Sequence, residues 1–178
     1  MLPIGPLMIE HRLIERMIRL IEKMIEALSQ GAHVDLAFLD FTVDFIRTYA
    51  DRCHHGKEEN ILFHDLEEKK LSPILRNILQ ELIEDHVKGR TIVTRIEKAK
   101  TRYLGGKSSA LTEIISQLKE LISFYPKHID KEENHFFRPV MDYFSNEERE
   151  NMLKEFADFD RSLIHAKYKE LVERSEAG

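Results

Sequence analysis

The sequence predicts an all-α protein, an up-down-up-down antiparallel four-helix bundle with an additional C-terminal helix. With seven Gly and five Pro among 178 residues and 33% charged residues, the chain has a helix-forming composition and little material for tight turns. Apolar residues recur at spacings of three and four through five segments, which only short turns separate. We therefore expect one domain over residues 1–178, with the bundle at about 7–140 and the appended helix at about 145–175.

The first three helices are bounded by residues typical of helix ends. The first is expected over residues 7–29, because Gly31 can adopt the left-handed conformation that ends a helix, and the second over 34–69. Ser72 and Pro73 then open a third helix. Serine can cap free backbone N–H groups, and proline lacks an N–H that the first turn would leave unpaired. This helix is expected to end at residue 103.

Proline and a capping box define the last two helices. The fourth is expected over residues 109–138, bent at Pro126 and ending before Pro139. Ser145 with Glu148 three residues later forms the capping box that opens the fifth helix. Its packing stripe, which we expect to cover the bundle, consists of Leu153, Phe156, Phe159, Leu163, Leu171 and Val172.

Composition excludes several classes of partner. The net charge is −5 and Lys and Arg are scattered among Glu, so the sequence predicts no surface that binds nucleic acid. The apolar runs are short and no signal-type cleavage site follows the N-terminus, so we expect a soluble cytoplasmic protein without membrane contact. The single cysteine, Cys53, allows no internal disulfide; we interpret it as a small buried residue, with redox or ligand chemistry beside His54 as the alternative.

An internal repeat carries the candidate chemistry. HHGKEENILF at 54–63 and HIDKEENHFF at 128–137 align as H-x-x-K-E-E-N-x-x-F. The first and third helices repeat more weakly, as IEHR around His11 and IEDH around His86, which lie 43 and 42 residues before His54 and His128. Each half of the chain thus supplies one early histidine and one H-x-x-x-E pair.

Helical geometry predicts that these histidines meet in the core. Each lies on the apolar stripe of its helix, and the glutamate four residues after His54 or His128 shares that inward face. Counted from the turns, the four histidines lie at one level of the bundle to within about two residues. Burying such groups is costly unless metal ions compensate, and this donor set suits iron, manganese or zinc. The candidate ligands of two metals are His11, His54, Glu58, His86, His128 and Glu132.

These residues, in this order, resemble the H…HxxxE…H…HxxxE pattern of the hemerythrin-like (HHE cation-binding) family over about residues 7–140. The resemblance implies an oxo- or hydroxo-bridged di-iron centre in a four-helix bundle, with bridging glutamates and terminal histidines. Oxygen carriers of the family have a fifth histidine in an H-x-x-x-H pair on the third helix and an aspartate on the fourth. Here Arg90 and Glu132 stand at those positions, which disfavours reversible oxygen carriage and leaves room for a fifth ligand from elsewhere.

Several neighbouring residues keep alternative interpretations. Because one residue turns an α-helix by about 100°, His55 is expected to be either exposed or a fifth ligand. Glu59 and Glu133 are expected either to be solvated or to contact the metal ligands from outside without binding the metals. His135 is a ligand, a channel-lining residue or a surface histidine. His33, His64 and His165 are interpreted as surface or packing histidines. Tyr49 and Tyr125 are interpreted as core tyrosines, with a hydrogen bond to an oxygen species bound at the metals as the alternative.

The sequence is compatible with three classes of function, which it supports to different degrees. The leading hypothesis is a binding protein rather than an enzyme: two iron ions that bind O₂ or NO, or iron itself, for sensing, storage or delivery. The alternative is a di-iron enzyme that reduces peroxide or NO, or donates iron for metal-cluster repair. A metal-free phosphotransfer or scaffold bundle is disfavoured, because phosphotransfer needs an exposed histidine and these four lie on buried stripes.

Overall fold

The computed structural model describes residues 2–176, with the side chains of 166 and 168–176 left out. Every regular element within those residues is helical, which confirms the all-α prediction. None of the described helices combines the length and the hydropathy that crossing a membrane requires.

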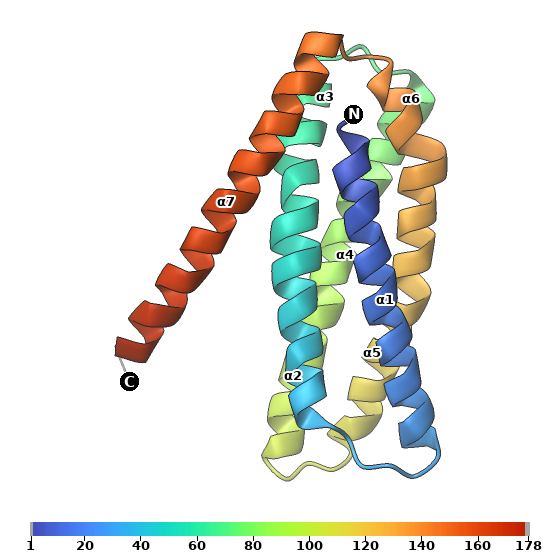
Figure 1. The fold of residues 1–178 in the computed structure, drawn as a ribbon. Coiled ribbons are helices and arrows are strands. Elements are labelled where there is room, and N and C mark those ends of the chain that lie inside the picture. Colours follow the sequence, from blue (N-terminus) through green and yellow to red (C-terminus); the bar gives the residue numbers. More distant parts are fainter. Residues whose placement is uncertain (1, 177–178) are drawn as a thin grey trace.

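The helices form four long columns and one diverging arm (Figure 1). The first column is α1 (Ile4–Ser29) and the third is α4 (Pro73–Leu104). The second column joins α2 (Leu36–Phe45), η1 (Ile46–His55), η2 (Glu58–Phe63) and α3 (His64–Glu67); the fourth joins α5 (Ala110–Asp130), η3 (Lys131–Phe136) and α6 (Phe137–Met141). The η segments are π-helical. From the end of the bundle where α6 lies, α7 (Asn146–Glu176) runs outward at an angle.

Capping residues place the helix ends close to the predicted positions. Gly31 has a φ of +91°, the left-handed conformation expected after the first helix. The Ser72 hydroxyl accepts a hydrogen bond from the Leu75 N–H at 3.3 Å. In the capping box the Glu148 N–H donates to the Ser145 hydroxyl and the Ser145 N–H donates to the Glu148 carboxylate, over 3.2 and 2.7 Å.

The predicted stop before Pro139 is wrong, because the fourth column continues to Met141. A proline inside a helix clashes with the carbonyl four residues earlier. Here the π-helical segment η3 ends at Phe136, whose φ of −120° and ψ of −57° depart from helical values, and α6 starts at the next residue. Pro139 thus lies in the first turn of a new helix, where its missing N–H breaks no hydrogen bond.

The apolar core consists of two clusters with a polar layer between them. One cluster holds residues after His11 and His86 and, apart from Ile129, before His54 and His128; Ile14, Leu39, Ile92 and Leu118 are among them. The other holds residues on the opposite side of each histidine, with Leu7, Leu62, Leu82 and Phe137 among them. In all four columns the histidine lies between residues of the first cluster and residues of the second. The four histidines are therefore at one level of the bundle, as predicted.

The arm α7 contacts the bundle through its first half. Met152 and Phe156 are buried in the second cluster, and Phe159 packs against it. Leu153 and Leu163 are only half-buried, and Leu171 and Val172 of the predicted stripe lie outside the described side chains. The expected cover is therefore partial: the first half of α7 packs along the second column, against η2 and η1, and the rest diverges from the bundle (Figure 1).

Candidate metal centre

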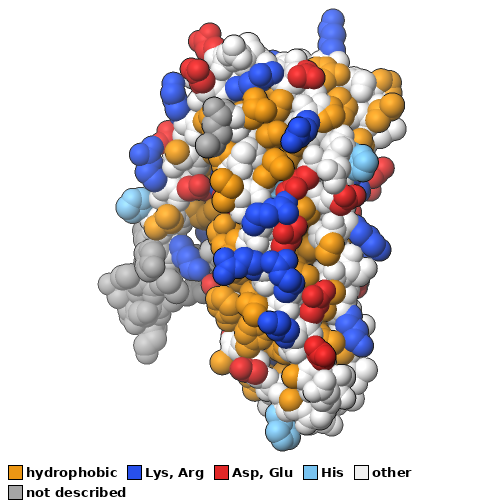
Figure 2. Space-filling view, turned by 45° about the vertical axis from the view of Figure 1, so that its right-hand side comes forward, with side chains coloured by type: hydrophobic (Ala, Val, Ile, Leu, Met, Phe, Trp, Pro, Cys, Tyr) orange, Lys and Arg blue, Asp and Glu red, His pale blue; other side chains and the backbone are white. Residues whose placement is uncertain are grey.

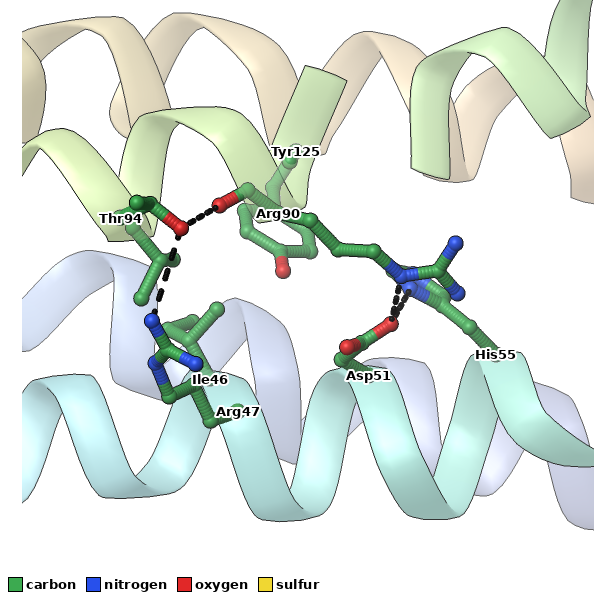
Figure 3. A pocket seen from close by; sticks show the side chains of 9 residues that line it. Ile46, Arg47, Asp51, His55, Arg90, Thr94 and Tyr125 are labelled. Carbon is green, nitrogen blue, oxygen red and sulfur yellow. Dashed lines mark hydrogen bonds and ion pairs between the residues drawn. The ribbon is translucent and has the colours of Figure 1, made fainter. Parts of the chain in front are cut away.

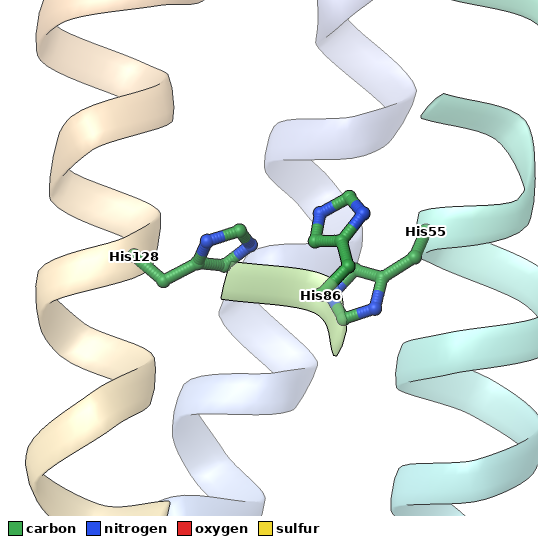
Figure 4. A group of neighbouring side chains, drawn as sticks. All are labelled: His55, His86 and His128. Atoms are coloured by element: carbon green, nitrogen blue, oxygen red, sulfur yellow. The ribbon is translucent and has the colours of Figure 1, made fainter. Parts of the chain in front are cut away.

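The six predicted side chains are all buried in the polar layer, where they belong to two groups of possible metal ligands. One group brings together His11 and His54 with Glu58 and Glu132. The other brings together His86 and His128 with His55 (Figure 4). Within each group the donor atoms all lie within 4.8 Å of one another, which is close enough for a single ion. Surface histidines are also visible in Figure 2, but the members of these groups are enclosed by the helices.

The two glutamates lie between the groups, with one carboxylate oxygen directed to each. Glu132 Oε2 is 3.0 Å from His11 Nε2, and Glu132 Oε1 is 3.3 Å from His128 Nε2. Glu58 Oε1 is 3.3 Å from His54 Nε2, and Glu58 Oε2 is 3.4 Å from His86 Nε2. This arrangement suits carboxylates that bridge two cations.

His55 lies inside the site, so the exposed alternative for this residue is wrong and the inward one is right. Its exposure is 2%, and its ring stacks on that of His86 with the centroids 3.9 Å apart. The physical reason is the π-helical segment η1, whose i→i+5 hydrogen bonds put more residues in each turn and rotate successive side chains by less than an α-helix does. His54 and His55 can then both face the interior. The repeat carried a signal for this, because His55 aligns with the apolar Ile129.

The remaining ambiguous residues are placed clearly. The His135 side chain is 62% exposed and lies near Asp130, away from both groups. Glu59 and Glu133 do not enter the groups but contact their histidines from outside. Cys53 is half-buried, and its thiol donates a hydrogen bond to Asp160.

Each of the five histidines has a carboxylate beside Nδ1. The Nδ1 atoms of His11, His54 and His86 are within hydrogen-bond distance of carboxylates, at 2.8, 2.9 and 2.7 Å. Those of His55 and His128 lie 3.5 Å from a carboxylate oxygen. An Nδ1–H that points to a carboxylate leaves Nε2 with a lone pair for a metal and fixes the orientation of the ring. The five carboxylates, in the order of these histidines, are Glu133, Glu10, Glu59, Asp51 and Asp85.

Cations hold these outer carboxylates in place. Arg12 contacts Glu133, and Arg90 pairs with both Glu59 and Asp51, at 2.6 and 2.8 Å. Two repeat-related lysines do the same: Lys57 for Glu10, and Lys131 for Asp85. Of these partners, only Glu59 and Glu133 are candidates from the sequence pattern, although Glu10 and Asp85 each directly precede a predicted histidine.

Burial strongly perturbs the titration of the central groups. Burial and the neighbouring Glu132 carboxylate raise the pKa of Glu58 well above its ordinary value. Burial also opposes the charge on Glu132, but His128 and His11 outweigh it and hold its pKa well below the usual range. Burial lowers the pKa of His54 to about 4, whereas Glu132 and Glu133 outweigh burial at His11 and raise its pKa to about 9.

These groups are left unsatisfied by the protein itself. Among the described side chains, all but one of the buried nitrogen and oxygen atoms without a hydrogen-bond partner belong to the five histidines, Glu58 and Glu132. Leaving so many buried polar atoms unpaired would be strongly destabilising. Because the orphaned atoms are imidazole nitrogens and carboxylate oxygens, with no thiolate among them, they fit two iron, manganese or zinc ions.

We expect metal-free protein to lose stability in mild acid. His54 has a folded pKa of about 4 against an ordinary value of 6.5, so between these pH values this residue binds more protons in the unfolded chain than in the folded one. By itself this difference removes about 3 kcal/mol of folding stability as the pH falls from 6.5 to 4. His55, whose pKa burial also lowers, adds to the loss, and the raised pKa of Glu58 offsets part of it. Urea unfolding of chelator-treated protein across this range measures the net loss, and unchanged stability would contradict the burial of His54 and His55 as neutral groups.

A small cavity of about 160 Å³ lies against the outer edge of His55, between the second, third and fourth columns (Figure 3). The Tyr125 side chain, Thr94 and the Asp51–Arg90 ion pair line it. Its volume is suited to molecules of a few atoms. Tyr125 is therefore a core tyrosine that also borders a cavity beside the site.

Comparison with known proteins agrees with this geometry. Residues 2–140 match the sequence model of the hemerythrin HHE cation binding domain. Neither a curated protein nor a solved structure matches the chain. The matched segment contains every residue of the two groups, and it ends before α7 begins.

Proposed function

Because the chain belongs to the hemerythrin HHE cation-binding domain family, we propose that it holds two iron ions and uses them to bind a small molecule such as O₂ or NO. The observation that carries this proposal is the pair of buried donor groups with two carboxylates lying between them. The family membership supports a metal, and the donor chemistry supports iron, with manganese or zinc as possible substitutes. The up-down-up-down bundle is part of the proposal, supported by the alternation of the two apolar clusters around the histidines.

The proposed ligands divide unequally between the ions. His55, His86 and His128 would hold one ion, and His11 and His54 the other, with Glu58 and Glu132 each giving one oxygen to both. One ion then has five protein donors and the other has four. The free coordination position for a small molecule therefore belongs to the ion on the side of His11 and His54.

The internal repeat explains this asymmetry. His54 corresponds to His128 and Glu58 to Glu132, but His55 corresponds to Ile129. Ile129 is buried in the cluster that also contains Ile14 and Ala50, which lie one turn from His11 and His54. At the place where the first repeat supplies a ligand, the second thus supplies an apolar side chain, which leaves space for an external molecule.

The chain's residues prepare the site before any ligand arrives. The outer carboxylates orient the imidazoles and keep Nε2 available, and the apolar clusters above and below exclude water. When bound, an iron pair supplies an open position and electrons for binding O₂ or NO.

We expect protein loaded under anaerobic conditions to contain close to two iron ions per chain. Exposure to oxidant should then produce the near-ultraviolet absorption bands of a bridged ferric pair. Metal analysis and absorption spectra, recorded before and after adding NO, test this expectation, and a loaded protein should melt at a higher temperature than the chelated one. Stoichiometric zinc with no spectrum after iron reconstitution would count against the proposal, and catalytic consumption of peroxide or NO would favour the enzyme.

A further inference from the structure

The arm α7 lies outside the segment that matches the family and contacts the bundle close to the centre. Its Phe159 packs directly over Gly56, which follows the two adjacent histidines: a Cβ atom at Gly56 would lie 2.7 Å from Phe159 Cζ. Only glycine allows this approach without displacing the ring. Beyond Asp160, α7 and the bundle border a groove of about 390 Å³ lined by Tyr49, Cys53 and Leu163. Asp160 is therefore at the edge where the arm begins to diverge.

A buried lysine connects α7 to a proposed ligand. The Lys57 side chain is 1% exposed, and its ammonium donates to Asp160 of α7 at 2.8 and 3.1 Å and to Glu10 of α1. Glu10 in turn accepts a hydrogen bond from His54 Nδ1 at 2.9 Å. A continuous chain of contacts thus runs from Asp160 through Lys57 and Glu10 to His54.

The second repeat lacks this connection, which shows that it is not a general requirement of the site. Lys131, the counterpart of Lys57, pairs with Asp85 and Glu81, and both of these belong to α4 within the bundle. Its side chain is 26% exposed, so water can solvate it. Among the side chains of the centre that the structure describes, only those in the half that contains His54 have a partner from α7.

Electrostatics makes the two ends of the chain of contacts dependent on each other. Burial opposes the charge on Lys57, but Asp160 and Glu10 outweigh it and raise the lysine pKa. Burial likewise opposes the charge on Glu10, but His54 and Lys57 outweigh it and lower the pKa of this carboxyl. If Asp160 left, Lys57 would lose one of its two acceptors and gain water, and Glu10 would be drawn toward the ammonium and away from His54.

We propose that Asp160 and Lys57 are positioning residues for the metal centre, through which the docking of α7 and metal binding by His54 stabilise each other. This inference rests on the proposed function. Coupling of this kind is reciprocal: if docked α7 tightens metal binding, then bound metal must tighten the docking of α7. A change at the ion held by His11 and His54 would then alter the docking of α7. A protein that binds α7 would be sensitive to that change.

The test compares single substitutions in the full-length protein, with and without iron. Asp160→Asn removes the charged acceptor on α7, and Phe159→Ala loosens the arm without removing a charge. Asp158→Asn is the control on the same helix, because the ion pair of Asp158 is with the neighbouring Arg161. Glu81→Gln is the control in the other repeat, because it removes the second acceptor of Lys131 as Asp160→Asn does for Lys57. Hydrogen exchange of residues 146–165, iron release to a chelator and the absorption spectrum are measured.

We expect iron to slow hydrogen exchange in α7 of the unsubstituted protein. Asp160→Asn and Phe159→Ala should both speed that exchange and release one of the two ions faster. For Asp160→Asn the release should be about tenfold faster, and the absorption bands should shift. Both controls should match the unsubstituted protein. The inference is overturned if iron leaves α7 exchange unchanged, or if Asp160→Asn loosens α7 while both ions leave at the original rate. Either result with two irons bound refutes only the coupling, whereas failure to bind two irons refutes the proposed function itself.

Discussion

Glu58→Ala is expected to reduce the metal content from two ions to one or none, whereas Glu59→Ala should keep both. Glu58 is buried between the two donor groups, with one oxygen facing His54 and the other facing His86. Removing this carboxylate takes away one ligand from each ion and leaves two cations repelling each other with less negative charge between them. Among the proposed ligands Glu59 contacts His86, and only at its outer nitrogen, so its loss should weaken metal binding without emptying the site.

Metal analysis after reconstitution measures the metal content of the two variants. The unfolding temperatures of the metal-free proteins show whether a low metal content is due to the lost ligand or to misfolding. Burial and Glu132 raise the pKa of Glu58, which means that the ionised side chain is unfavourable in the empty site. Chelated Glu58→Ala protein should therefore unfold at a temperature no lower than chelated unsubstituted protein. If Glu59→Ala emptied the site while Glu58→Ala retained two irons, the assignment of Glu58 as the bridging residue would be off by one position.

Ile129→His is expected to abolish the binding of NO or azide while retaining two iron ions. The repeat aligns Ile129 with His55, and Ile129 is buried in the cluster that contains Ile14 and Ala50, one turn from His11 and His54. An imidazole there would provide the fifth protein donor that this ion lacks and would occupy the position left for an external molecule. Coordination by this added imidazole should raise the metal affinity of the variant, because three histidines would then hold each ion.

Titration of the reduced protein with NO, and of the oxidised protein with azide, followed by absorption spectra, tests this expectation. Ile129→Leu is the matched control, since it keeps an apolar side chain of the same volume and should bind both molecules as the original does. Two irons together with undiminished NO binding in Ile129→His would show that the free position lies elsewhere. That result would leave the two-metal assignment intact.

Much of the architecture could be predicted because it depends on local periodicity. The apolar stripes of the columns, the capping residues Ser72 and Ser145, and the left-handed Gly31 act within a few residues of their own position. The shared level of the histidines follows from helix rise and turn position alone. These features brought the six predicted side chains to one layer of the core, as the structure has them.

The errors share one physical cause, the use of regular α-helical geometry where the chain is π-helical. The π-helical segment η1 turns His55 inward beside His54, and the end of η3 at Phe136 allows the column to continue through Pro139. An extra residue in a helical turn is a small local cost that the surrounding packing outweighs. The amino-acid order alone does not show whether tertiary packing outweighs the local cost of a π-helical turn.

The helical class, the repeat and the set of inward-facing histidines and glutamates follow from the amino-acid order, because each depends on spacing along one helix. The packing of the helices determines which atoms meet across them. It divides five histidines into a group of three and a group of two, gives every imidazole an outer carboxylate, and places Lys57 between Glu10 and Asp160. Contacts between distant segments depend on the packing of whole helices against one another, and local periodicity carries no information on that packing beyond the face that turns inward.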